Sequence, residues 1–112
     1  MLPQMNKPSF FDISQLQSQR AAIGPGYLEF LRVPTMSAGV YVLPAGRTDP
    51  QSPHKEDEMY YVVSGRARMT IDDVEEVVKS GSVIFVAAHQ RHRFHDIEEE
   101  LTVLVFFAPA ES

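Results

Sequence analysis

The sequence predicts an all-β fold, a sandwich or barrel, with one short helical segment near its N-terminus. From residue 27 onward, the chain consists of short runs of β-branched and aromatic residues separated by Gly, Pro and Asp turns. Only residues 14–22 have the character of a helix. The length of 112 residues predicts one domain, with an N-terminal arm and helix over 1–26 and a β-barrel over 27–108.

The helix is expected to begin at Ser14, whose hydroxyl is a suitable N-cap. Ile13, Leu16 and the alanines that end the segment give it a short apolar side. The sequence Gly24-Pro25-Gly26 should terminate it, because glycine and proline both interrupt helices.

The remaining elements are expected strands. Gly65 is read as the turn of a hairpin, and Asp72-Asp73 as a second turn. The expected strands cover residues 27–33, 37–43, 58–64, 66–71, 74–78, 82–87, 92–97 and 101–107.

Two of these segments, 59–63 and 101–107, are apolar at both odd and even positions. Because side chains alternate between the faces of a strand, such strands are expected to be covered on both sides. The barrel interior provides one cover, and a second sheet, the N-terminal segment or a partner subunit provides the other. Together with the aromatic pairs Phe10-Phe11 and Phe106-Phe107, this pattern predicts a homodimer.

Composition excludes several classes of function. The chain has no cysteine, so disulfides, thiolate metal sites and cysteine nucleophiles are absent. Its net charge of −5 argues against nucleic-acid binding, which requires a basic surface. The sequence shows neither a signal peptide nor a membrane-spanning apolar stretch, which predicts a cytoplasmic protein without a membrane partner.

Glycines and polar residues recur at defined spacing in two places. These are Gly46-x5-Ser52-x-His54-x3-Glu58-x6-Gly65 and Gly81-x5-Ala87-x-His89-x2-His92-x3-Asp96. The pattern resembles the two motifs of the cupin superfamily, G-x5-H-x-H-x3-4-E-x6-G and G-x5-P-x-G-x2-H-x3-N. The short spacer between Gly65 and Gly81 is similar to that of small microbial cupins. The resemblance implies the cupin double-stranded β-helix, a jelly-roll barrel.

Carried over residue by residue, the resemblance implies metal ligands at His54, Glu58 and His92. Two imidazoles and a carboxylate suit a divalent metal such as Fe, Mn, Ni or Zn. The family's first histidine is replaced by Ser52, so Gln51 and His89 are candidates for a fourth ligand. The alternative is a metal-free barrel with structural histidines.

Strand alternation predicts which neighbours face the interior. Glu58 and Tyr60 share a face, as do His92 and Phe94, whereas His95 has the opposite parity. The pocket is therefore expected to be lined by Tyr60 and Phe94, with His89 at the turn. Asp96, on the same parity as His92, is a candidate acceptor that orients a ligand.

The resemblance leaves two function classes open, both with a small-molecule ligand in the barrel. One is a metal-dependent enzyme, since the superfamily includes dioxygenases, decarboxylases and sugar isomerases or epimerases. The other is a non-catalytic ligand-binding or structural dimeric barrel, because this fold supports many functions.

Overall fold

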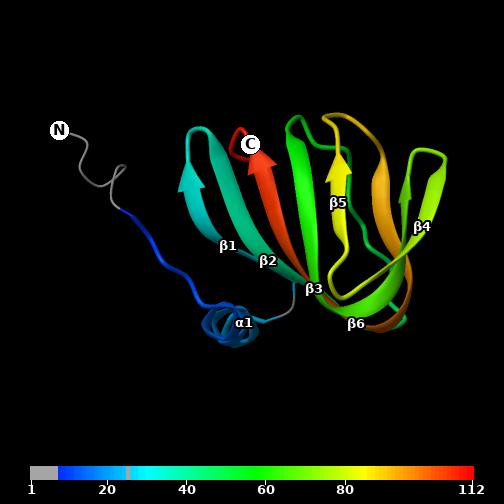
Figure 1. Ribbon diagram of the computed structural model, residues 1–112, viewed down its shortest axis with the longest axis horizontal. Helices are drawn as coiled ribbons and strands as arrows, with labels where there is room; N and C mark the ends of the chain where they lie inside the picture. Colours follow the sequence, from blue (N-terminus) through cyan, green and yellow to red (C-terminus); the bar gives the residue numbers. More distant parts are fainter. Residues whose placement is uncertain (1–7, 25) are drawn as a thin grey trace.

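A computed structural model describes residues 8–24 and 26–112, which form one helix and six strands (Figure 1). The helix is α1 (Ile13–Ala22). The strands are β1 (Gly26–Val33), β2 (Met36–Leu43), β3 (Asp57–Ile71), β4 (Val74–Lys79), β5 (Val83–Val86) and β6 (His92–Ala108). All pairings are antiparallel, in the order β1-β2-β6-β3-β4, with β5 also on β3. The predicted cupin β-helix with a short N-terminal helix is confirmed.

Two long bent strands, β3 and β6, form the frame of the barrel. They pair with each other along their whole length, from Asp57–Ala108 at one end to Ile71–His92 at the other. One half of β3 also pairs with β5 and the other half with β4. The expectation of four separate strands in these regions is wrong, because the chain bends within each strand without turning back.

Gly65 marks the bend of β3 and is not the hairpin turn that its sequence context predicts. Its φ of +101° lies in the left-handed region, and a Cβ here would lie 2.2 Å from the carbonyl oxygen of Glu100 on β6. Only glycine allows the two backbones to approach this closely. The hairpin turn comes later, at Asp72-Asp73, as predicted.

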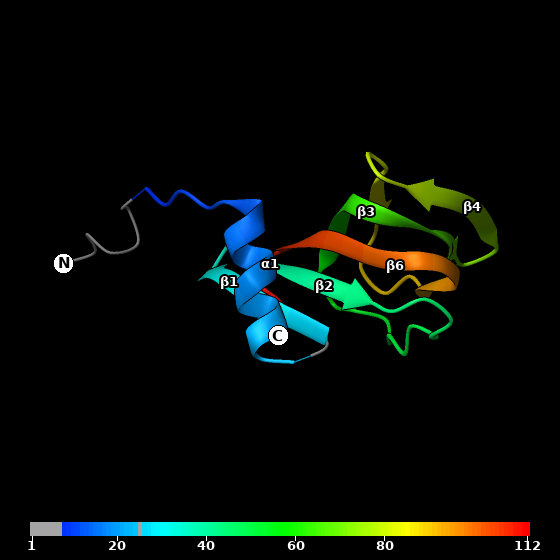
Figure 2. The same ribbon diagram turned by 90° about the horizontal axis from the view of Figure 1, so that it is seen from below.

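The helix covers part of the outer face of the barrel. Its buried residue Leu16 packs with Val40 and Val42 of β2, and Leu104 of β6 joins this cluster. Figure 2 shows α1 lying across β1 and β2. Within segment 101–107, the N-terminal helix thus covers the outer face at Leu104. The N-cap is Asp12 and not Ser14, since the Asp12 carboxylate accepts from the backbone N–H groups of residues 14 and 15.

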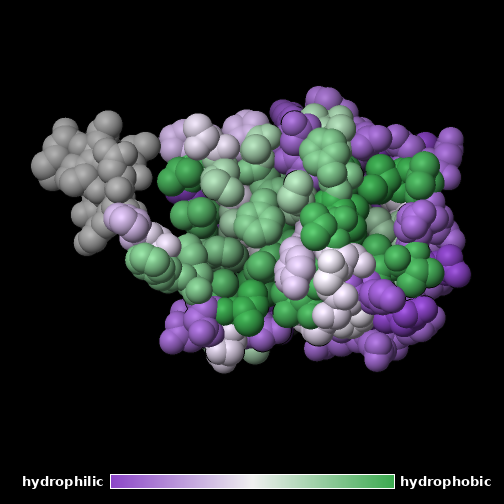
Figure 3. Space-filling view, viewed as in Figure 1, coloured by the Kyte–Doolittle hydropathy of each residue, from purple (hydrophilic) through white to green (hydrophobic). Residues whose placement is uncertain are grey.

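In segment 59–63 only the inner face is covered by the described chain. Tyr60 and Val62 are fully buried in the barrel, whereas Met59 and Tyr61 are 44% and 40% exposed. They pair with Phe85 and Val83 of β5, which are also exposed. Figure 3 shows apolar side chains gathered over β4 and β5 on this face.

Among the described helices, none is long and apolar enough to cross a membrane.

Candidate metal centre

The structure brings His54, Glu58 and His92 together at the mouth of the barrel, as the motif spacing predicts. Each offers one ligand atom, and these atoms lie within 4.8 Å of one another. Glu58 is the second residue of β3 and His92 the first of β6, and they lie at opposite ends of the β3–β6 ladder, opposite Phe107 and Ile71. The bending of the two strands, and not direct pairing, brings the two side chains together. His54 lies on the loop that leads into β3.

The polar atoms of this group lack ordinary partners. Within the described part of the chain, both carboxylate oxygens of Glu58 and Nε2 of His92 are buried without an aligned hydrogen bond. Nε2 of His92 lies 3.0 Å from Oε1 of Glu58, close enough for an ion-pair contact. A buried carboxylate is costly unless a cation offsets its lost hydration. Two imidazole nitrogens and one carboxylate are a donor set that first-row divalent metals bind.

A backbone carbonyl holds the ring of His92 in place. Its Nδ1 lies 2.9 Å from the carbonyl oxygen of Gln90. A carbonyl only accepts, so Nδ1 carries a proton, and Nε2 is the ring nitrogen that faces Glu58 and is available to a metal. Burial lowers the pKa of His92, but the contacts with Glu58 and with the Gln90 carbonyl outweigh it and raise the pKa above its ordinary value.

Gln51 directs its amide oxygen toward the group. This oxygen accepts from the Tyr60 hydroxyl at 3.0 Å and lies 3.2 Å from Nε2 of His54. The amide nitrogen donates to Asp49. The side chain is thereby held with its oxygen facing the ligands, an arrangement compatible with a fourth donor.

Asp49 is a buried residue that the sequence gives no reason to single out. It is 2% exposed and accepts hydrogen bonds from the Tyr41 hydroxyl at 3.0 Å, the backbone N–H of Phe94 at 3.1 Å, and Gln51. These bonds fasten the loop between β2 and β3, which carries Gln51 and His54, to the neighbouring strands. In sequence Asp49 resembles an ordinary solvated loop charge, so only its three-dimensional partners show its role.

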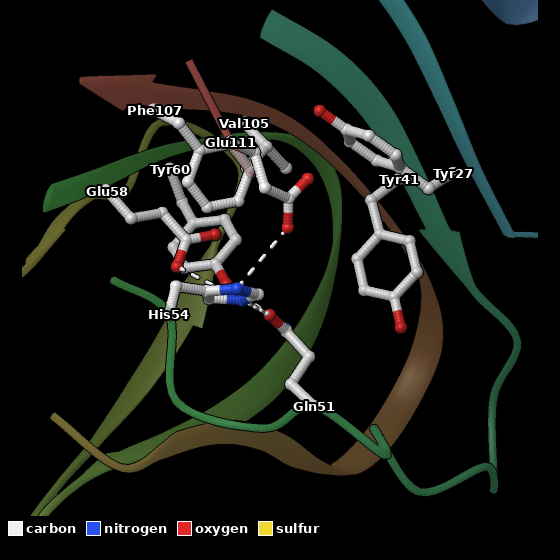
Figure 4. Close-up of a pocket in the computed structure, with 9 residues that line it drawn as sticks. All are labelled: Tyr27, Tyr41, Gln51, His54, Glu58, Tyr60, Val105, Phe107 and Glu111. Atoms are coloured by element: carbon white, nitrogen blue, oxygen red, sulfur yellow. Dashed lines mark hydrogen bonds and ion pairs between the residues drawn. The ribbon is translucent and has the colours of Figure 1, made fainter. Parts of the chain in front are cut away.

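A cavity of about 200 Å³ opens beside two of the three ligands, His54 and Glu58 (Figure 4). Its walls are mostly aromatic and aliphatic, and no Lys or Arg of the described chain lines it. The lining residues are Tyr27, Tyr41, Gln51, His54, Glu58, Tyr60, Val105, Phe107 and Glu111. Burial raises the pKa of Tyr27, Tyr41 and Tyr60, so all three phenols remain protonated.

Tyr27 and Glu111 are among the cavity residues that lie outside both motifs and were missed by sequence reasoning. Tyr27 is on β1, and its hydroxyl is buried without a partner among the described residues. Glu111 follows β6, and its Oε2 lies 3.3 Å from Nδ1 of His54. No spacing rule connects these positions to the ligands, because the fold alone brings the start of β1 and the segment after β6 to the barrel mouth.

Three predicted positions prove to lie elsewhere. Phe94 is buried beneath Tyr60, with ring centroids 5.0 Å apart, and does not line the cavity. His89 is exposed at φ +70°, and its N–H donates to the backbone carbonyl of His54 at 2.7 Å. Asp96 adopts φ +47° and is exposed, because an irregularity in β6 breaks the alternation after Phe94. His95 points away from the ligands toward Thr70, as predicted.

Comparison with known proteins identifies the same architecture. The family model described as a cupin domain matches residues 39–108. Uncharacterized protein SCO3923 of Streptomyces coelicolor is 50% identical over 102 residues, covering 91% of this chain and 97% of that protein.

Among solved structures, an RmlC-like cupin family protein from Methanocaldococcus jannaschii has a TM-score of 0.71 at 19% identity, covering 92% of this chain and 90% of that one. The DMSP lyase DddQ from Ruegeria pomeroyi has a TM-score of 0.64 at 21% identity, and the match covers 68% of this chain and only 39% of the lyase.

Proposed function

The chain belongs to the cupin family, and on that premise we propose that it binds one divalent metal through His54, Glu58 and His92 and acts on a small molecule in the adjoining cavity. The observation that carries this proposal is the buried carboxylate of Glu58, which lacks an aligned hydrogen bond within the described chain and lies 3.0 Å from the equally buried Nε2 of His92. Buried polar groups of this kind add nothing to an apolar core, and a cation between them would offset the desolvation cost of burying them. Iron, manganese, nickel and zinc all suit this donor set.

The proposed chemistry divides between the metal and the chain. A divalent metal here would supply Lewis acidity to a carbonyl or hydroxyl oxygen of the substrate, or a site for dioxygen. Gln51, held by Asp49 and Tyr60, keeps a neutral oxygen at the ligand group. The protonated hydroxyl of Tyr27, which has no partner of its own among the described residues, can donate a hydrogen bond to the substrate.

The cavity also limits what the substrate can be. A volume of about 200 Å³ admits only a small molecule. Glu58 and Glu111 place two carboxyl groups in the wall and no Lys or Arg of the described chain lines it, so apart from the metal and His54 the wall offers no cation to a strongly anionic substrate. We therefore propose a small, uncharged substrate that offers one oxygen to the metal and apolar surface to Val105 and Phe107.

The test is the metal content of wild type, His92→Ala and His95→Ala after identical purification and incubation with iron(II), manganese, nickel or zinc. Removing one of three ligands should abolish most binding in His92→Ala. His95→Ala is the matched control, because His95 faces Thr70 and Glu75 outside the ligand group. Near-zero occupancy in all three proteins would overturn the proposal, as would equal binding by wild type and His92→Ala.

A further inference from the structure

The segment that follows β6, residues 109–112, is fastened at several points beside the barrel mouth. The N–H of Glu111 donates to the hydroxyl of Ser37 at 2.9 Å, and its carbonyl accepts from Arg32 at 2.6 Å. The next N–H, of Ser112, donates to the carboxylate of Glu56 at 3.1 Å. Ser37 and Glu56 are themselves buried. The backbone on both sides of the Glu111 side chain is therefore fixed to β1, β2 and the loop before β3.

This anchorage directs the Glu111 carboxylate into the cavity and onto the outer nitrogen of His54. Oε2 lies 3.3 Å from Nδ1 of the imidazole, and the side chain is 30% exposed. Figure 4 shows Glu111 and Gln51 approaching the His54 ring from different directions. The other ring nitrogen, Nε2, lies 3.9 Å from Oε1 of Glu58, on the side of the ligand group.

The two imidazoles of the proposed centre share one feature, an oxygen acceptor at Nδ1, although Nε2 of His54 also has the Gln51 amide oxygen 3.2 Å away. In His92 the backbone carbonyl of Gln90 takes Nδ1 and leaves Nε2 toward Glu58. In His54 a carboxylate from a distant part of the chain occupies the corresponding position. An acceptor at one nitrogen selects the tautomer that leaves the other nitrogen free to bind metal, and it orients the ring.

We propose that Glu111 is a positioning residue, whose carboxylate holds Nδ1 of His54 so that Nε2 faces the metal. The inference rests on the proposed function, because it assigns Glu111 a part in building that same centre. The inference also extends the proposed function, since it makes segment 109–112 part of the site although this segment lies outside both motifs. His54 sits on a loop and needs such a support more than His92, which begins a strand.

The first test compares the affinity for Ni²⁺ and Zn²⁺ of wild type, Glu111→Ala and Glu111→Gln by calorimetry. Loss of an outer hydrogen-bond partner of a metal-bound histidine typically weakens binding by about 10–100-fold, and we expect a loss in this range for Glu111→Ala. Glu111→Gln retains an oxygen that accepts from Nδ1–H and should restore most of the affinity. Glu98→Ala is the control, because Glu98 is 68% exposed and pairs with Arg66 on the outer surface.

The second test reads the His54 tautomer directly, from imidazole nitrogen-15 NMR spectra of the metal-free proteins. Wild type and Glu111→Gln should carry the proton on Nδ1. In Glu111→Ala the proton should move toward Nε2, because the Gln51 oxygen 3.2 Å away is then the remaining acceptor. If Glu111→Ala only loosened segment 109–112, the His54 proton would not move from one ring nitrogen to the other.

Wild-type affinity in Glu111→Ala would overturn the inference. Equal weakness of Glu111→Gln and Glu111→Ala would also overturn it, because the carboxylate would then be acting as a direct ligand. If the His54 proton stays on Nδ1 in Glu111→Ala, the inference is also overturned, because Glu111 then does not set the tautomer. If wild type itself binds no metal, the proposed function fails, whereas the NMR comparison still decides whether Glu111 sets the His54 tautomer.

Discussion

Replacing Asp49 by alanine should destabilise the protein strongly, although Asp49 is neither a predicted ligand nor part of a hydrophobic cluster. The carboxylate is 2% exposed and accepts three hydrogen bonds, from Tyr41, Gln51 and the backbone N–H of Phe94. Alanine would leave the Phe94 N–H buried without a partner. An unsatisfied buried donor costs about 1–3 kcal/mol, and a hydrogen bond to a charged group contributes about 1.5–3 kcal/mol.

Removing the charge also relieves its desolvation cost, which offsets part of that loss. We therefore expect the free energy of unfolding to fall by about 3 kcal/mol, a large share of the roughly 5–15 kcal/mol that a domain has. For a chain of about 100 residues this lowers the Tm by roughly 12 °C or more. The free energy of unfolding of Asp49→Asn should lie between those of wild type and Asp49→Ala, because the asparagine amide places an N–H group against one of the three donors.

Urea and thermal unfolding followed by circular dichroism measure these differences. Asp73→Ala is the control, since Asp73 lies exposed in the turn between β3 and β4. Metal affinity should fall in Asp49→Ala as well, because the loop that carries Gln51 and His54 loses its fastening. A change in unfolding free energy below about 0.5 kcal/mol, the usual scatter for surface substitutions, would refute this account of Asp49.

Two further predictions concern the strands. Gly65→Ala should lower the free energy of unfolding by at least about 3 kcal/mol, because φ is +101° and the new Cβ would lie 2.2 Å from a backbone oxygen. Gly81→Ala is the control: its φ of +93° is similar but the space around it is open, so it should lower the free energy of unfolding by only about 1–2 kcal/mol of backbone strain. Equal urea midpoints for the two variants would contradict this. The exposed apolar face of β3 and β5 should be a homodimer interface, so wild type should sediment as a dimer at micromolar concentration and Phe85→Glu as a monomer. A monomeric wild type would reject the dimer.

Much of the fold could be predicted from sequence because its signals are local. Alternation placed Tyr60 and Val62 inside the barrel, and the spacing of His54, Glu58 and His92 indicated that they meet. Such patterns depend on neighbours within one strand or turn. They fail where a strand bends without ending, as at Gly65, or where an irregularity reverses the alternation, as at Asp96.

The family, most of the strand content and the three residues of the proposed centre can be read from the amino-acid order. The distant groups that complete the site are visible only in the folded chain. Asp49 is buried because the Phe94 N–H lies beside it, and Glu111 reaches His54 because Ser37, Arg32 and Glu56 fasten its segment. These contacts join residues tens of positions apart, so no local periodicity or spacing encodes them, and they exist only once the barrel has closed.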